Sequence, residues 1–432
     1  MTAEIAVMNE EAIALAADSA VSSSSKIFTS ANKIFALSKY HPVGVMVFAR
    51  AQFLNVPWET IIKQYRRQLG VKSFSTLEEH AEDFLKFFNG KNALFPPDAQ
   101  ERSALMIAYD LFQLVLAETA EKVARQKAEG NTPSDAMLVK ATEESIGEQL
   151  ARWTAGGQRE GLPKGYRAQV DKRYGPKIDE TIATVFSEAK LSKGALGELR
   201  QLVSAYLASE DYYWLNLSQS GIVIAGFGSE DVFPRLARFY FHGIASNRLK
   251  SVEIETLKVS HEMPAVISPF AQDEEVVTFM EGISPALRGY LDSWITRKLL
   301  EVLSEAGEHL KLSEAKTAEM VKAMSGRCLE AVRKDLEEDL AAFKWETSID
   351  PIIDVVRMLP KDELAAMAES LVNLTSFKRR VTTERETVGG PIDVAVISRG
   401  DGFIWIKRKH YFSPELNPQF AANYYRKTES DD

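Results

Sequence analysis

Short apolar runs separated by polar turns occupy the first fifty residues of the chain. Ala3–Met8 and Ala12–Ala17 are small and apolar, and the polar turn Asn9-Glu10-Glu11 divides them. Ile34–Leu37 and Val43–Ala49 follow in the same manner. Runs of this length between turn residues are typical of buried strands. The pattern therefore predicts two strand hairpins at the start of the chain.

Helical periodicity then alternates with strands. Residues 56–69 place their apolar side chains on one face, and residues 73–210 are almost wholly helical in pattern. Strands return at 221–257 and 264–270, and helices resume from about residue 273 to 343. An amphipathic helix over 361–376 precedes two last strands, 392–397 and 403–406. Strand hairpins and helices in this order predict an α+β fold with antiparallel sheets and helical insertions.

Composition and charge narrow the class of protein. The chain has 432 residues, of which 45% are hydrophobic and 26% charged, as in ordinary globular proteins. A net charge of -9 argues against binding to nucleic acid or to an anionic membrane. The single cysteine, Cys328, argues for a reducing compartment, and we expect a cytoplasmic protein.

The start of the chain lacks the features of a targeting segment. No apolar run approaches the ~20 residues of a membrane span. The run Ala12–Ala17 is too short for the core of a signal peptide, and it follows acidic residues. We therefore expect the encoded N-terminus to be kept, apart from Met1.

Thr2 would then carry a free amine and a hydroxyl on one residue. An α-amino group has a pKa of about 7.7–8, so part of it is neutral near pH 7. The neutral amine can accept the hydroxyl proton while Oγ attacks a carbonyl. Thr2 is therefore a candidate nucleophile that supplies its own general base.

Two further residues fit this chemistry. If the first turn is centred on Glu10, residue i faces residue 20 − i, which places Asp18 opposite Thr2. Lys33 starts the next strand. A lysine ammonium there would lower the pKa of the Thr2 amine and stabilise a developing alkoxide, while Asp18 would orient that lysine.

The set of residues resembles a known family. Thr2, Ala16-Ala17-Asp18 and Asn32-Lys33-Ile34 resemble the proteasome β-subunit and HslV-type peptidases, which are N-terminal nucleophile (Ntn) hydrolases. Residues 43–49 are similar to the strand that supplies the oxyanion-hole amide, with Ala49 where the family has glycine. Residues 222–228 and Gly389-Gly390 are similar to later parts of the catalytic domain.

The resemblance implies a fold and a division of the chain. The fold would be a four-layer αββα Ntn sandwich within residues 1–412, assembled from about 2–70, 215–285 and 350–412. Residues 73–210 and 285–345 would be helical insertions, and 413–432 a polar tail.

The resemblance also implies an activity. The chain would be a threonine peptidase in which Thr2 is the nucleophile, Lys33 and Asp18 assist, and the Ala49 N–H is the oxyanion donor. Val21, Val47 and Phe53 would line the substrate pocket. No metal or organic cofactor would be needed. The implied partners are a peptide or protein substrate, further copies of the chain and an ATP-dependent unfoldase.

Two alternatives belong to other classes. In the first, the fold is a catalytically inactive scaffold whose helical insertions bind a partner. In the second, the protein is an amidase that acts on small molecules. Replacing Thr2 by alanine separates the enzyme from the scaffold, because only the enzyme loses an activity.

Overall fold

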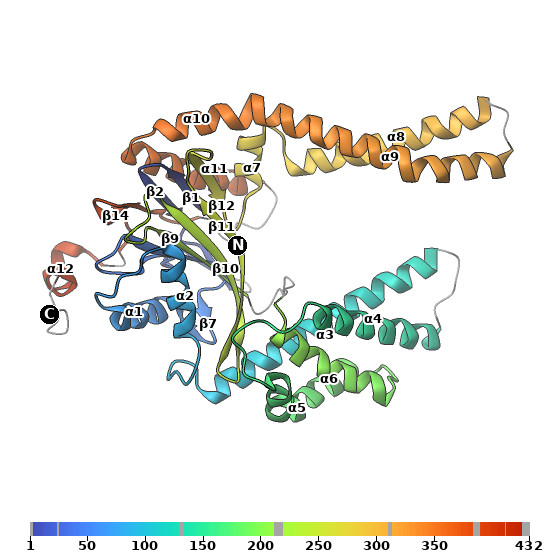
Figure 1. Ribbon diagram of the computed structural model, residues 1–432, viewed down its shortest axis with the longest axis horizontal. Helices are drawn as coiled ribbons and strands as arrows, with labels where there is room; N and C mark the ends of the chain where they lie inside the picture. The colour runs from blue at the N-terminus through green and yellow to red at the C-terminus, as the bar shows by residue number, and fades with distance from the viewer. Residues whose placement is uncertain are drawn as a thin grey trace. The chain divides into compact units, whose positions relative to one another are not determined.

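The structure is a computed structural model that describes residues 3–23, 26–128, 134–210, 219–309, 313–382, 389–410 and 412–425. Figure 1 shows the course of the chain. The chain divides into two compact units. Unit 1 comprises residues 1–30, 259–396 and 405–409, and unit 2 comprises residues 31–258, 397–404 and 410–432.

The sheet of unit 1 has the strand order β12-β1-β2-β13-β14. β1 pairs antiparallel with both β12 and β2. All residues of β1, β2 and β13 are buried, which explains their almost continuous apolar sequences. The strands are β1 Glu4–Asn9, β2 Ala12–Ala17, β12 Ala265–Pro269, β13 Asp393–Ser398 and β14 Gly402–Lys407. A small separate hairpin pairs β3 Val21–Ser23 with β4 Lys26–Phe28.

Three helices cover one face of this sheet. α7 Glu274–Glu281, α10 Asp350–Met358 and α11 Lys361–Val381 share a hydrophobic core with alternate residues of β1 and β2. The helices α8 Pro285–His309 and α9 Glu314–Lys344 lie side by side as a hairpin, which we call the α8–α9 arm (Figure 1). A short π-helical turn, Trp345–Ile349, joins α9 to α10.

The sheet of unit 2 has the order β11-β10-β9-β6-β5, and neighbouring strands in it pair antiparallel. The strands are β5 Ile34–Ala36, β6 Val43–Phe48, β9 Ser220–Gly226, β10 Arg235–Ala245 and β11 Arg248–Lys258. The helices α1 Trp58–Leu69 and α2 Leu77–Phe87 pack on one face of this sheet, where they share a core with alternate residues of β6, β9 and β10. A short hairpin, β7 Gln52–Phe53 with β8 Val56–Pro57, lies between β6 and α1.

A bundle of four helices follows in unit 2. It consists of α3 Pro97–Ala128, α4 Asp135–Ala155, α5 Tyr166–Val185 and α6 Lys193–Ala208, which share a second hydrophobic core (Figure 1). The long helix α3 also packs against β10 and so joins the bundle to the sheet. After β14, the chain forms a short 3₁₀ turn, Pro414–Leu416, and the helix α12 Pro418–Tyr425.

Helix α3 is long enough and apolar enough to cross a membrane by length and composition alone, and half of its most apolar stretch is buried within the structure. The burial is that of a core helix in the bundle, since Ile107, Leu111 and Val115 on this helix are fully covered.

The prediction of an α+β fold with antiparallel sheets is confirmed. The expected strands at 12–17 and 43–49 and the expected helix at 361–376 correspond to β2, β6 and α11. Residues 73–210 and 285–345 are mainly helical, as expected. The stacking of the two sheets into a four-layer Ntn sandwich is not confirmed.

The predicted register of the first hairpin is wrong by one residue. Glu4 faces Ala17 and Met8 faces Ile13, so residue i faces residue 21 − i. The reason is the turn, because Asn9 belongs to β1 and only Glu10 and Glu11 form the loop. The side chain of Asn9 stabilises this tight loop by accepting hydrogen bonds from the N–H groups of Glu11 and Ala12.

Candidate functional site

Asp18 is the centre of the candidate site in unit 1. Its side chain is fully buried and follows directly after β2. Oδ1 accepts a hydrogen bond from the backbone N–H of Ala3 at 3.1 Å. Oδ2 accepts from the N–H groups of Ala20 at 3.2 Å and Gly389 at 2.9 Å. Since buried carboxylates require such donors, Asp18 joins the start of the chain to the segment that begins at Gly389.

The nucleophile candidate itself, Thr2, lies outside the described residues. Its neighbour Ala3 is buried and pairs with Asp18, because the N–H of Asp18 also donates to the Ala3 carbonyl at 3.0 Å. The expected pairing of Thr2 with Asp18 is therefore corrected to a pairing of Ala3 with Asp18, as the register requires.

The segment Gly389-Gly390-Pro391 packs closely on the turn after β2. The N–H of Ser19 donates to the Gly389 carbonyl at 3.2 Å, and the Ser19 hydroxyl donates to the carbonyl of Pro391. Gly390 has a φ of +79°, and a Cβ there would lie 2.8 Å from Cβ of Thr29. Glycine is required at this position by both backbone conformation and space. The residues before it, Thr383–Val388, lie outside the described residues.

Lys33 and Val47 lie together in unit 2. The Val47 N–H donates to the Lys33 carbonyl at 2.9 Å, immediately before β5. Both side chains are buried, with exposed fractions of 4% each. Asp18 belongs to unit 1, so the expected contact between its carboxylate and the Lys33 ammonium stays a prediction.

Ala49 has an unusual backbone. It follows the last residue of β6 and has a φ of +67°, the left-handed region that favours glycine. A non-glycine residue in this region stores strain, and such residues cluster at functional sites. In this conformation the peptide groups at the end of β6 turn away from the direction that they have in the strand. Such a change of direction is compatible with the expected role of the Ala49 N–H as an oxyanion donor. That role stays a prediction.

The three residues expected to line a substrate pocket occupy different environments. Val21 is half-buried in unit 1. Phe53 in unit 2 is 2% exposed, and its ring stacks on Trp58 at 5.4 Å between centroids and meets Phe241 edge-on at 5.7 Å. Val47 and Phe53 belong to the same core cluster. A substrate pocket that contains all three residues stays a prediction.

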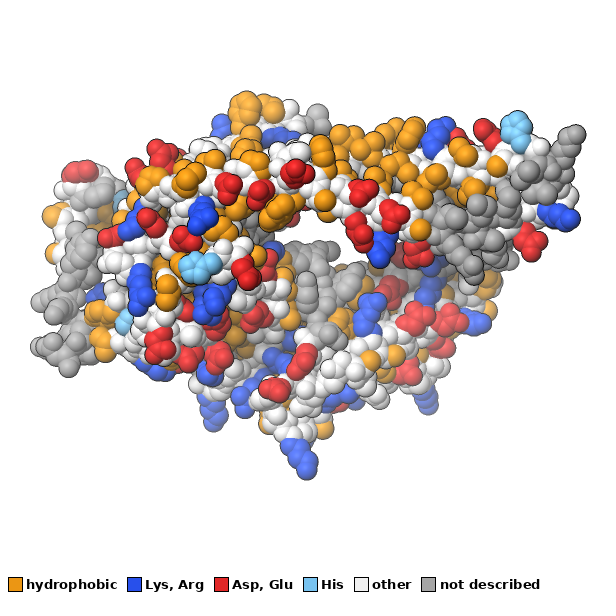
Figure 2. Space-filling model, turned by 45° about the horizontal axis from the view of Figure 1, so that its top comes forward, with side chains coloured by type: hydrophobic (Ala, Val, Ile, Leu, Met, Phe, Trp, Pro, Cys, Tyr) orange, Lys and Arg blue, Asp and Glu red, His pale blue; other side chains and the backbone are white. Residues whose placement is uncertain are grey.

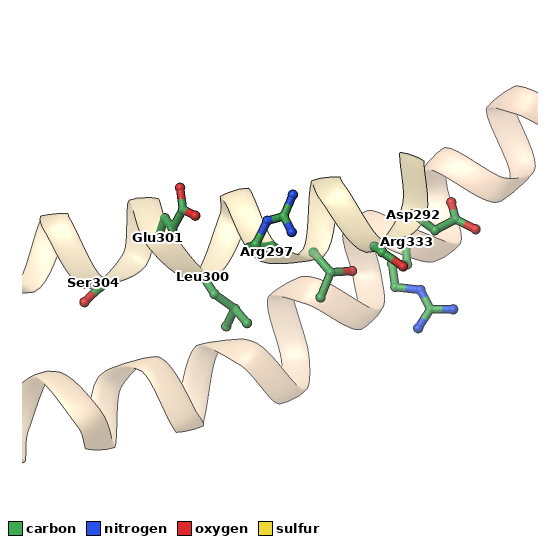
Figure 3. Close-up of a pocket in the computed structure, with 8 residues that line it drawn as sticks. Asp292, Arg297, Leu300, Glu301, Ser304 and Arg333 are labelled. Carbon is green, nitrogen blue, oxygen red and sulfur yellow. The ribbon is translucent and has the colours of Figure 1, made fainter. Parts of the chain in front are cut away.

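One open groove lies in unit 1, between α8 and α9 of the arm, with a volume of about 700 Å³. Figure 3 shows that Leu300 points into the space between the two helices, whereas Arg297 and Glu301 point away from that space. Its lining carries charges of both signs that do not converge on one point. The groove therefore differs from a typical small-molecule site, in which a few polar groups converge.

A smaller cavity of about 100 Å³ borders Phe53 in unit 2. It also brings together Arg50, Arg102 and His242, none of which the sequence analysis selected. These residues come from three distant segments with no shared motif, so no local signal could have found them. Within the described ranges, no group of three or more His, Cys, Asp or Glu side chains is arranged to hold a metal ion.

The chain has weak structural similarity to known proteins and no detected similarity in sequence. No protein-family model matches the chain, and no curated protein matches it. Two similar solved structures are both of Anbu. One is a mutant from Hyphomicrobium sp. strain MC1, with 6% identity over 98% of this chain and 94% of that chain and a TM-score of 0.25. The other, described as an ancestral beta-subunit from Yersinia bercovieri, has 9% identity over 97% and 93% and a TM-score of 0.26.

These comparisons correct the family assignment. The resemblance of Thr2, Asp18 and Lys33 to the proteasome β-subunit and HslV-type peptidases is wrong as an assignment, because no family model or curated protein matches this chain. The TM-scores of 0.25 and 0.26 are too low to support any shared function. Three short motifs at similar spacing are therefore insufficient evidence of membership.

Proposed function

We propose that the protein hydrolyses peptide or other amide bonds with Thr2 as the nucleophile, after removal of Met1. The Thr2 amine acts as the general base and accepts the hydroxyl proton while Oγ attacks the carbonyl carbon. The C–N bond of the substrate then breaks, and the amine leaves with the proton that the Thr2 ammonium returns to it, which gives an ester between Oγ and the acyl group. Water, deprotonated by the same amine, hydrolyses this ester and releases the acid and the Thr2 hydroxyl. The Ala49 N–H stabilises the oxyanion, and the Lys33 ammonium stabilises the developing negative charge.

The observation that carries this proposal is the anchoring of Ala3 by Asp18. A buried carboxylate holds the N–H of the residue next to Thr2 at 3.1 Å, and β1 begins one residue later. Reactions of this kind require the nucleophile to be held within a fraction of an ångström of its productive position. The anchoring of Ala3 restricts the positions open to the residue before it, and this supports the proposed role of Thr2.

The test is the intact mass of the purified protein before and after incubation with a peptide epoxyketone. This reagent forms a stable ring only with an amine and a hydroxyl on the same N-terminal residue. We expect loss of Met1 and the addition of one reagent molecule. Thr2→Ala should remove the adduct and the hydrolysis of fluorogenic peptides while the protein stays folded.

A pair of lysine variants tests the mechanism. Lys33→Ala should lower the rate of adduct formation by roughly a hundredfold, because it removes the charge that activates the amine. The matched control is Lys39→Ala, which removes an exposed lysine from the same part of the chain. Retention of Met1, or a Thr2 that is free but inert toward the reagent, would overturn the proposal.

The α8–α9 arm favours a second candidate function, that of an interaction protein. Leu287, Tyr290, Leu291 and Trp294 follow the i, i+3, i+4, i+7 spacing and form one stripe on α8, with exposed fractions between 39% and 60%. Figure 2 shows hydrophobic side chains in orange along the arm. A continuous exposed apolar stripe on a helix is a typical docking face.

This second function makes a different prediction. Tyr290→Ser combined with Trp294→Ser should abolish a specific cross-link between the arm and a partner in cells, while Thr2→Ala should leave the cross-link unchanged. If Thr2→Ala abolishes peptide hydrolysis and the arm variant has no effect on any cross-link, the interaction function is excluded.

A further inference from the structure

The cavity of about 100 Å³ in unit 2 lies between three elements. The segment 50–55, with its short β7–β8 hairpin, forms one side, and the start of α3 forms another. His242 of β10 forms part of the lining from the sheet. The volume is about three times the ~30 Å³ that a water molecule occupies in the liquid, so a small ligand or the head of a larger one fits.

Two arginines stand at the mouth of the cavity. Arg50 is exposed and makes no ion pair with any residue in the described part of the chain. Arg102 on α3 donates from Nη1 to Asp98 at 2.9 Å, and its guanidinium has five N–H groups in total. Both therefore keep donors for a ligand. Guanidinium groups pair preferentially with the planar fork of a carboxylate or with a phosphate.

The inner lining is formed by buried donors. Ser103 is 6% exposed and His242 is 1% exposed. Tyr206 Oη lies 2.8 Å from His242 Nδ1, and the side-chain amide nitrogen of Gln219 lies 3.4 Å from the same atom. An amide nitrogen only donates, so Nδ1 is the acceptor and the neutral ring carries its hydrogen on Nε2. His242 is therefore a fixed donor through its other nitrogen.

The charge behind the histidine is positive. Burial, together with the nearby charges of Lys250 and Arg159, lowers the pKa of His242 to about 3. Lys250 is fully buried, donates to the Ser209 hydroxyl at 3.3 Å, and lies over the ring of Tyr206 at 4.9 Å. Cations in a region of low dielectric raise the potential of the cavity and favour an anion there.

The remaining wall is apolar and conformationally strained. Phe53, Leu54 and Met106 contribute hydrocarbon surface. The turn at Leu54-Asn55 has φ values of +49° and +65°, and a left-handed conformation is especially unusual for leucine. A two-residue turn with both φ values positive closes the β7–β8 hairpin, and Leu54 lines the cavity from this turn.

We propose that this cavity, with Arg50 and Arg102 at its mouth, His242 and Ser103 inside and Phe53 and Leu54 as its wall, binds a carboxylate that carries a short apolar group. The arginines bind the two carboxylate oxygens, and the apolar group contacts Phe53 and Met106. The carboxylate belongs to a free small acid or to the C-terminus of a peptide. The small volume and the apolar wall favour this class over inorganic phosphate. The proposal is independent of Thr2 and of the proposed hydrolysis.

The test is calorimetric titration of the full chain with sodium butyrate, butyramide, inorganic phosphate and an acetylated tetrapeptide that ends in alanine, as free acid and as amide. Butyrate or the free-acid peptide should bind saturably, and the two uncharged analogues should not. Arg50→Gln and Arg102→Gln should each weaken binding by about tenfold or more. Tighter binding of butyrate than of the peptide acid assigns a small acid, and the reverse assigns a peptide end.

Two controls make the result specific to the cavity. Arg152→Gln removes an exposed arginine of α4 in the same unit and should leave the affinity unchanged. Thr2→Ala should also leave the affinity unchanged, because none of the proposed ligand contacts uses that residue. In nuclear magnetic resonance spectra, the ring nitrogens of His242 should shift on addition of butyrate. Absence of saturable binding, equal binding of phosphate or butyramide, or unchanged affinity in both arginine variants would overturn the proposal.

Discussion

The hydrogen bonds of the Asp18 carboxylate cannot all be formed by an amide of the same shape. Its two carboxylate oxygens accept three backbone N–H groups, from Ala3, Ala20 and Gly389. Asparagine would keep one oxygen and would point an NH₂ group at one or more of these donors. Asp18→Asn should therefore lower the free energy of unfolding by about 3 kcal/mol, measured by urea denaturation. Asp354→Asn, an exposed carboxylate of α10 in the same unit, should change it by less than about 0.5 kcal/mol.

Ala49 is a residue whose replacement should stabilise the protein. Its φ of +67° is unfavourable for any side chain and costs nothing for glycine. Ala49→Gly should raise the free energy of unfolding by about 0.5–1 kcal/mol, because the relief of strain exceeds the added entropy of the unfolded chain. Ala51→Gly, at a nearby exposed residue whose φ is not positive, should lower it by a similar amount. Equal destabilisation by both variants would contradict this account.

At the scale of elements, Asn9 ties the first hairpin to a helix. Nδ2 donates to the carbonyls of Val356 at 3.1 Å and Leu359 at 2.9 Å, at the end of α10, while Oδ1 stabilises the turn. Asn9→Ala leaves these buried groups unpaired and should cost about 2–4 kcal/mol in thermal or urea unfolding. Asn32→Ala, where an exposed amide is lost, is the control and should be nearly neutral. A neutral Asn9→Ala would mean that packing alone holds α10 on the sheet.

The first hairpin shows which features of the fold could be predicted from the sequence and which could not. The apolar runs predicted the ends of β2 and β6 to within one residue, because strands that are buried on both faces have continuous apolar sequences. The register failed because the choice between a two-residue and a three-residue turn depends on hydrogen bonds of Asn9 and not on hydrophobicity. A similar limit applies to sites. Asp18 could be selected from its place after β2, but Arg50, Arg102 and His242 meet only in the folded unit.

At the scale of the whole molecule, two buried histidines link stability to pH. Burial and the neighbouring His41 lower the pKa of His80 to about 4, and the pKa of His242 is lowered to about 3. In the unfolded chain both take up a proton near pH 6.5. The unfolded state therefore binds more protons below that pH, and stability present above pH 6.5 is lost as the pH falls toward 4.

The expected slope is about 1.0–1.3 kcal/mol per pH unit for each histidine over pH 5–6, where few carboxylates titrate. Urea unfolding at several values between pH 7.5 and pH 5 measures it. His80→Phe keeps an aromatic ring beside Phe74 and should roughly halve the slope. His261→Phe replaces a histidine whose side chain is 87% exposed and should leave the slope unchanged. A flat profile for the wild type would show that the buried rings are protonated or accessible.

The discontinuity of unit 1 has a consequence for synthesis on the ribosome. β1 emerges first, yet its partner β12 follows roughly 250 residues later, and β13 later still. At about 5–20 residues per second the nascent β1–β2 hairpin waits more than ten seconds with unpaired apolar edges. Such edges are templates for wrong pairing with other chains. The yield of native protein is therefore expected to depend on translation speed and on chaperones that shield the first thirty residues.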